Sequence, residues 1–183
     1  MNEEDPLANS GHSDVETSLF DDEIASLARR VVKENRDAGR KIVLAESCTG
    51  GLVAAAITEI SGSSAVLDRA YVTYSNESKH DCLNVSDDLL DAFGAVSVAC
   101  VYAMAQGALE NSEADVAVAI SGIAGPTGGS EQKPVGTVVF ARVIKGDEKP
   151  HAESRRLGDK EGSWTRAEIR RQATLCALEL LLP

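Results

Sequence analysis

The chain has 183 residues, of which 43% are hydrophobic, and this length suits one globular domain with its own core rather than two. Its formal net charge is -11, and it lacks the Lys/Arg cluster with which proteins neutralise nucleic-acid phosphates, so nucleic acid is not an expected partner. No run is long and apolar enough to span a membrane, so we expect a soluble, cytoplasmic protein without membrane contacts.

The acidity is concentrated at the amino terminus, where every acidic residue up to Glu23 precedes the first basic residue, Arg29. Residues 1–20 are polar and lack the basic start and apolar centre of a secretory signal. We therefore expect a disordered acidic leader at 1–20, followed by a single domain at 21–183.

From residue 21 onward, segments with helical spacing of apolar residues alternate with short apolar runs typical of strands. In chain order we predict a helix at 21–39, a strand at 41–46, a helix at 50–60 and a strand at 69–75. Helices follow at 76–83, 86–93 and 98–111, then strands at 115–121, 135–144 and 151–157, and a closing helix that contains Ile169 to Leu180. Asp21 or Asp22 is expected to cap the first helix, and Asn76, Ser86 and Ser97 are expected to cap the three central ones.

This alternation favours a sheet covered by helices on both faces. The strands at 135–144 and 151–157 are joined by a short turn, so they should form an antiparallel pair. We therefore predict an α/β fold, a three-layer α/β/α sandwich with a mixed, partly antiparallel sheet.

The cysteines and histidines give no sign of a metal site. The cysteines are widely scattered, form no C-x-x-C pair and have no closely spaced histidines beside them. We expect neither a structural zinc nor a disulfide framework, and no cofactor.

The stretch "VLAESCTGG" at 43–51 is the first candidate for chemistry. Ser47 lies just beyond a strand, and the amides of Cys48, Thr49 and Gly50 are placed where they could face an anion or a developing oxyanion. Ser and Thr are also favoured helix caps, and on this stretch alone a capped helix is the better interpretation. Cys48 is a rival nucleophile, since a helix start lowers the pKa of a thiol, although a small residue here is more often part of the core.

A serine nucleophile needs a base, and the three histidines lie in the leader, beside a charged run and at the start of an edge strand. Lys79 falls three residues after Asn76, in a first helical turn where the macrodipole and burial would depress its pKa toward a useful range for a base. Tyr74 is placed to hydrogen-bond both Ser47 and Lys79 and to relay the proton. The alternative is a solvated lysine and a packed tyrosine.

The glycine-rich segment "SGIAGPTGGSEQKPVGT" at 121–137 is too long for a simple turn, and long ordered loops are commonly functional. Ser121, Gly122 and the following amides suit a phosphate or carboxylate, although the pattern fits neither a Walker loop nor a dinucleotide motif. The other interpretation is a mobile surface loop. Among the carboxyl-terminal arginines, Arg170 lies off the apolar face of its helix and is a candidate phosphate clamp.

In order, "AESCTGG", "YVTYSNESKHDCLNV", "GAVS", "SGIAGPTGG", "KPVGTV" and "IRRQA" resemble the C-terminal domain of the competence/damage-inducible protein CinA over residues 24–182. The resemblance implies hydrolysis of the carboxamide of nicotinamide mononucleotide to nicotinate mononucleotide and ammonia, a step of pyridine nucleotide salvage that needs no metal. By motif, the family's serine nucleophile falls on Ser47, its tyrosine on Tyr74 and its lysine on Lys79. The larger N-terminal domain of full-length CinA proteins has no counterpart, so its activity is not expected.

The same resemblance places a substrate-contacting hydroxyl on Ser121 and an arginine on Arg170. The full set of expected substrate contacts is Cys48, Thr49, Gly50, Asn76, Ser121, Gly122 and Arg170. A homodimer or higher homo-oligomer is expected. The alternative function is a non-catalytic module that binds a pyridine nucleotide or regulates a competence or DNA-damage response.

Overall fold

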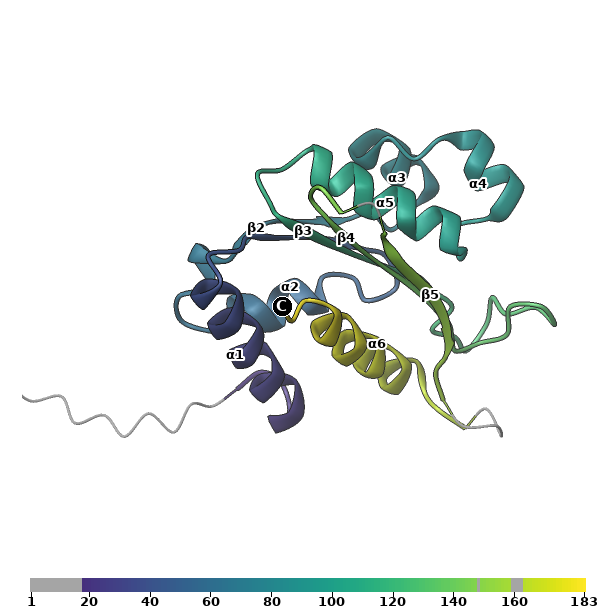
Figure 1. Ribbon diagram of the computed structural model, residues 1–183. Helices are drawn as coiled ribbons and strands as arrows, with labels where there is room; N and C mark the ends of the chain where they lie inside the picture. The colour runs from purple at the N-terminus through teal and green to yellow at the C-terminus, as the bar shows by residue number, and fades with distance from the viewer. Residues whose placement is uncertain (1–17, 148, 159–162) are drawn as a thin grey trace, which may run out of the picture.

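The computed structural model describes residues 18–147, 149–158 and 163–183 (Figure 1). Its helices are α1 (Asp22–Asp37), α2 (Leu52–Thr58), α3 (Asn76–Leu83), α4 (Asp87–Phe93), α5 (Val98–Glu110) and α6 (Arg166–Leu180), with a 3-10 turn, η1, at Ser63–Ala65. Its strands are β1 (Ile42–Glu46), β2 (Leu67–Val72), β3 (Val116–Gly122), β4 (Thr137–Ile144) and β5 (His151–Arg156). The helices and strands thus follow the order that the sequence predicts.

Most of the expected leader, residues 1–17, lies outside the described residues, so its disorder stays a prediction. The last residues of that segment are described and make contacts. The Ser18 hydroxyl donates to the Glu59 carboxylate over 3.0 Å, and Phe20 packs against the core cluster to which the buried residues of α1 belong.

The five strands form one sheet in the order β2-β1-β3-β4-β5. β1 is parallel to both β2 and β3, whereas β4 is antiparallel to β3 and to β5. The mixed sheet and the antiparallel last pair are therefore confirmed. The parallel strands are joined by helical crossovers, and the antiparallel strands by loops that need no helix.

Helices cover both faces of this sheet (Figure 1): α1, α2 and α6 lie on one side and α3, α4 and α5 on the other. The strand residues divide accordingly, because Ile42 and Leu44 of β1 belong to the core under the first group, and Val43 and Ala45 to the core under the second. The predicted three-layer α/β/α sandwich is confirmed. Among the described helices, none has the length and apolar character needed to cross a membrane.

The residues that cap the amino ends of the helices can be compared with those predicted from the sequence. Asp21, Ser86 and Ser97 cap their helices with side-chain oxygens, as predicted. The cap expected at Asn76 is wrong, because the hydroxyl of the preceding residue, Ser75, accepts from the third amide of α3 in a capping box. Asn76 is instead the first helical residue, so Lys79 lies one position deeper in α3 than expected.

Candidate active site

The carboxyl ends of the parallel strands bring three hydroxyl groups to one face of the sheet. The ladder continues one residue past β1 and β2, because the Ser47 amide donates to the Ile120 carbonyl and the Thr73 amide to the Glu46 carbonyl, each over 2.9 Å. Successive residues of an extended chain point to opposite faces, so Ser47 and Thr73 share with Ser121 of β3 the face covered by α3 and α5. All three residues are buried.

Lys79 approaches this face from α3, and only 1% of its surface is exposed. Its Nζ lies 3.2 Å from the Ser47 hydroxyl oxygen, 2.8 Å from the Thr73 carbonyl and 3.3 Å from the Ser75 carbonyl. A neutral amine has two N–H groups for the two carbonyls and one lone pair that can accept the Ser47 proton. The structure therefore brings together the serine and the lysine that the sequence singled out.

Burial lowers the pKa of Lys79 below its ordinary value, because the ammonium form loses its hydration. The nearby Cys100, Cys48 and Glu77 act in the opposite direction and more weakly. The direction agrees with the sequence-based expectation, although burial is the principal cause. A lysine with a lowered pKa, in contact with a hydroxyl, is suited to act as a general base.

Glu46 points to the opposite face and occupies the amino terminus of α2. Its buried carboxylate accepts from the Thr49 hydroxyl (2.6 Å) and from the amides of Gly51 (2.9 Å), Val53 (3.3 Å) and Ala54 (2.9 Å). The expected cap by Ser47 or Thr49 is thus wrong, since Glu46 takes that role and the Thr49 hydroxyl donates to it. A glutamate that ends a buried strand, four residues before a pair of glycines, is the signal that would have identified it.

The turn after Ser47 also narrows the set of possible oxyanion donors. The Gly50 amide donates to the Ser47 carbonyl over 3.0 Å, which removes it from the three amides that the sequence suggested. The amides of Cys48 and Thr49 have no hydrogen bond to another described residue. Gly50 and Gly51 adopt φ values of 61° and 94°, which glycine tolerates best, and this turn delays the start of α2 to Leu52.

Cys48 is 5% exposed and packs in the core between the sheet and α2. Burial raises the pKa of its thiol to about 12. The expectation that a helix start would lower this pKa is wrong, because desolvation outweighs the dipole. A thiol that stays protonated at neutral pH is a poor nucleophile, so Cys48 is no longer a rival to Ser47.

Arg170 of α6 supports the turn that carries Ser47. Its Nε donates to the Cys48 carbonyl over 3.1 Å and its Nη2 to the Thr49 carbonyl over 2.8 Å. A guanidinium has five N–H donors, so this bracing leaves others that can serve a ligand. The structure places Arg170 against the turn that follows Ser47 and gives it a structural role that the sequence did not indicate.

Tyr74 does not make the contacts expected of a proton relay. It is 60% exposed, and its hydroxyl accepts from Nη2 of Arg166 over 2.8 Å. Among the described residues its hydroxyl has no hydrogen bond to Ser47 or Lys79, which contact each other directly. Arg166 also donates to the Gly125 carbonyl over 2.9 Å, so it links the tyrosine to the glycine-rich loop, a role that sequence reasoning missed.

The glycine-rich loop begins later than predicted, because Ser121 and Gly122 are still paired with β4. A Cβ on Gly122 would lie 2.9 Å from the Val138 side chain, so the close approach of β4 explains this glycine. The sequence suggested that the amides after Gly122 could hold an anion. The first of them, of Ile123, instead donates to the Thr137 carbonyl over 2.9 Å and is not available for an anion. Asn76 lies exposed at the start of α3.

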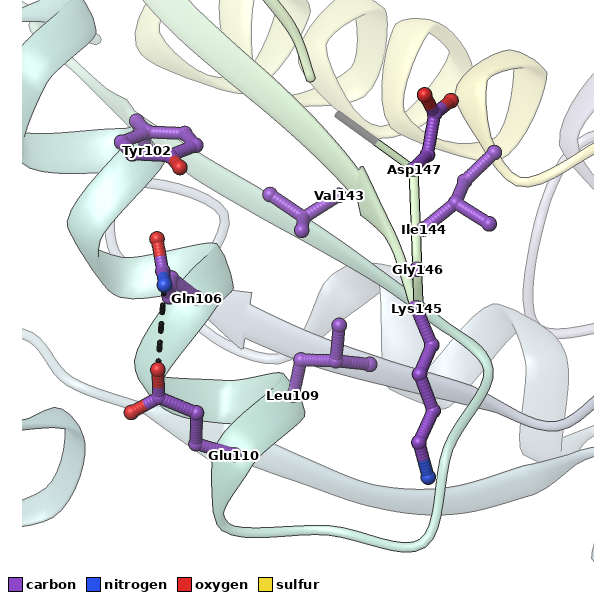
Figure 2. A pocket seen from close by; sticks show the side chains of 9 residues that line it. All are labelled: Tyr102, Gln106, Leu109, Glu110, Val143, Ile144, Lys145, Gly146 and Asp147. Atoms are coloured by element: carbon purple, nitrogen blue, oxygen red, sulfur yellow. Dashed lines mark hydrogen bonds between the residues drawn. The ribbon is translucent and has the colours of Figure 1, made fainter. Parts of the chain in front are cut away.

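A pocket elsewhere in the molecule contains none of these residues. Figure 2 shows it between α5 and the turn that follows β4, with Gln106 donating to Glu110 over 3.2 Å on one wall. Ile144, at the end of β4, pairs with Val116, the first residue of β3, so this pocket lies at the end of the sheet opposite Ser47. It therefore gives no support to the chemistry considered above.

In this α/β protein, a serine contacts a buried lysine at the carboxyl ends of the parallel strands, an arrangement that is suited to nucleophilic attack. The chain belongs to the CinA C-terminal domain family, whose model matches residues 24–183. Nicotinamide-nucleotide amidohydrolase PncC of Escherichia coli strain K12 is 47% identical over 163 residues, which cover 89% of this chain and 95% of that protein. The protein of the same name from Enterobacter agglomerans is 50% identical over 141 residues, covering 77% of this chain and 82% of the relative.

The fold is shared with a solved structure of the family. The crystal structure of the competence/damage inducible protein CihA from Agrobacterium tumefaciens has a TM-score of 0.84 and 48% sequence identity. The similarity covers 90% of this chain and 96% of that one.

Proposed function

We propose that this protein is an amidohydrolase that converts nicotinamide mononucleotide to nicotinate mononucleotide and ammonia, with Ser47 as nucleophile and Lys79 as base. The observation that carries the proposal is the 3.2 Å contact between Lys79 Nζ and the Ser47 hydroxyl oxygen, inside a site that keeps the lysine out of water. The names of the two bacterial relatives, both nicotinamide-nucleotide amidohydrolases, supply the substrate.

In the proposed reaction, neutral Lys79 takes the Ser47 proton as the serine oxygen attacks the carboxamide carbon. The C–N bond then breaks, and Lys79 returns the proton to the leaving nitrogen, which departs as ammonia. A water molecule next attacks the resulting ester, with Lys79 again accepting a proton, and Ser47 is regenerated with release of the acid. The protons balance within each half of the cycle.

The developing negative charge on the carboxamide oxygen is assigned to the amides of Cys48 and Thr49. The phosphate is assigned to the Ser121 hydroxyl and to those N–H groups of Arg170 that do not brace the turn. Tyr74 then belongs to the rim of the site with Arg166 rather than to the proton path. Direct transfer between Ser47 and Lys79 replaces the tyrosine relay because the direct contact already exists.

The proposed setting is pyridine nucleotide salvage in the cytoplasm, by a homodimer or a higher homo-oligomer. Nicotinamide mononucleotide is the only ligand that the proposal requires. The proposed reaction involves neither nucleic acid nor a membrane.

The proposal is tested by ammonia release from nicotinamide mononucleotide, with free nicotinamide and NAD as comparison substrates. Ser47→Ala should lower kcat by at least about 10³-fold and unfold at the temperature of the wild type. Cys48→Ala is the matched control, since it changes the adjacent residue and should keep most of the activity. Full activity in Ser47→Ala would overturn the assignment, and binding of the nucleotide by the wild type without any product would favour the non-catalytic module.

A further inference from the structure

The Thr73 hydroxyl is an unusual feature of the site. Thr73 is 1% exposed, and its Oγ1 is buried without a hydrogen-bond partner among the described residues. Its backbone is fully used, because the amide donates to Glu46 and the carbonyl accepts from Lys79. Burying a hydroxyl without a partner costs free energy, and valine would have nearly the same shape without that cost. We therefore expect a protonation state of the site in which this hydroxyl makes a hydrogen bond.

Counting hydrogens shows which state that is. With Lys79 neutral, its two N–H groups and the Ser47 hydroxyl give three hydrogens. Three acceptors lie within reach of them, namely the carbonyls of Thr73 and Ser75 and the lysine lone pair. The hydrogens of the Lys79 amine and of the Ser47 hydroxyl are then all satisfied without Thr73, whose hydroxyl has no hydrogen bond.

Protonation of Lys79 adds one hydrogen-bond donor and removes one acceptor. The ammonium has three N–H groups, the lone pair is gone, and Ser47 keeps its own hydrogen, so four hydrogens face the two carbonyls and the Ser47 oxygen. The Tyr74 carbonyl, at 3.5 Å from Nζ, lies at the limit of hydrogen bonding. The Ser75 carbonyl already accepts from the Lys79 amide and from the Ser78 hydroxyl. The additional hydrogen therefore needs another acceptor, and Thr73 Oγ1 is the buried side-chain oxygen of this site that has no partner among the described residues.

The groups around Lys79 supply little compensating charge. Burial raises the pKa of both Cys48 and Cys100, so these thiols stay neutral, and Glu77 lies exposed in the first turn of α3. Cys48, Cys100 and Glu77 are the titratable groups that act on the Lys79 amine from the elements packed around it. Neutral oxygens must therefore stabilise the ammonium.

We propose that Thr73 is a positioning residue whose hydroxyl oxygen accepts the additional hydrogen bond when Lys79 is protonated, either from Nζ or from the Ser47 hydroxyl. In the proposed amidase reaction, on which its catalytic role rests, the bond from Nζ holds the ammonium once the Ser47 oxygen is bonded to the carboxamide carbon and until Lys79 returns the proton to the leaving nitrogen. The hydroxyl thereby favours proton transfer from serine to lysine.

The test is the pKa of Lys79, measured without substrate by NMR titration of its labelled side chain and assigned by its absence in Lys79→Arg. Thr73→Val should lower this pKa by about 1, because one hydrogen bond to the charged form is lost. Thr73→Ser should keep the wild-type value, since it retains the hydroxyl. Thr58→Val, which removes an exposed hydroxyl from α2, is the matched control and should change nothing.

In the enzymatic assay, the midpoint of the pH profile of kcat/KM should move to lower pH in Thr73→Val and return in Thr73→Ser, which a purely structural role would not produce. An unchanged Lys79 pKa in Thr73→Val overturns the proposal, as does an equal shift in Thr73→Val and Thr73→Ser, which would assign the effect to packing. If the valine variant fails to fold, Thr73→Ala and Thr73→Ser make the same comparison. Because the titration needs no substrate, its result stands apart from the amidase proposal, which fails if the wild type releases no ammonia.

Discussion

Glu46 and Ser47 are neighbours in the chain, yet they serve the two faces of the sheet in opposite ways. The Glu46 carboxylate points toward α2 and accepts hydrogen bonds from a hydroxyl and three amides, so its bonding capacity is filled by the fold. Ser47 points toward α3, where it meets a lysine that burial deprives of water. The buried polar groups on the first face stabilise the turn. Those on the second include a lysine amine in contact with a serine hydroxyl and a Thr73 hydroxyl without a hydrogen-bond partner among the described residues.

The difference shows where reactivity can be located in this fold. A fully satisfied polar network rigidifies its surroundings, whereas a partly satisfied one costs stability and is retained where it does chemistry. Glu46, together with Arg170 on the same side, fixes the turn from which Ser47 projects. The face of Glu46 therefore positions the face of Ser47, for which we propose the chemistry, and substitutions on the two faces should have different consequences.

The largest effect on folding is expected for Glu46→Gln. The new amide group would face hydrogen-bond donors that now meet a carboxylate oxygen, so the free energy of unfolding should fall by about 2 kcal/mol. Urea denaturation measures this change. The midpoint of the pH–rate profile should stay where it is, because Glu46 does not contact Lys79.

Glu110→Gln is the matched control, since Glu110 is exposed and accepts one side-chain hydrogen bond within α5. It should change the free energy of unfolding by less than about 0.5 kcal/mol. Equal stability losses in the two variants would contradict the structural role given to Glu46.

A smaller effect is expected for Tyr74→Phe, which tests whether the Tyr74 hydroxyl takes part in proton transfer between Ser47 and Lys79. If protons pass directly between Ser47 and Lys79, loss of this hydroxyl should lower kcat less than about tenfold, whereas an essential relay would cost about 10²–10⁴-fold. Steady-state kinetics decide between the two routes. Tyr71→Phe is the control, because its hydroxyl donates to the Asn111 carbonyl, away from the site, and should leave kcat unchanged.

Local signals in the sequence predicted the elements and most of their caps. The apolar periodicity of α1, the serines before α4 and α5, and the short turn between the last strands each act within a few residues, so they can be recognised without tertiary information. The serine and the lysine of the site were also recognised, because a nucleophile after a strand requires a base and no histidine was suitably placed.

The remaining features depend on contacts between distant segments. Arg166 reaches Tyr74 across 92 positions of sequence, and Arg170 reaches the Cys48 carbonyl across 122, so neither bond has a local signature. The raised pKa of Cys48 follows from burial by elements packed around it rather than from its place at a helix start. Sequence reasoning therefore found the serine and the lysine that lie in contact, but not the groups that hold the turn and Tyr74 in place.

The pH dependence of kcat/KM for ammonia release from nicotinamide mononucleotide tests the central claim most directly. Lys79 must be neutral to accept the Ser47 proton, so kcat/KM should fall as the pH drops below the pKa of Lys79 and level off above it. The midpoint should lie below the ordinary lysine value of 10.5, because burial lowers this pKa. A profile without this limb, or the same limb in Lys79→Arg, which cannot lose its proton, would contradict Lys79 as the base.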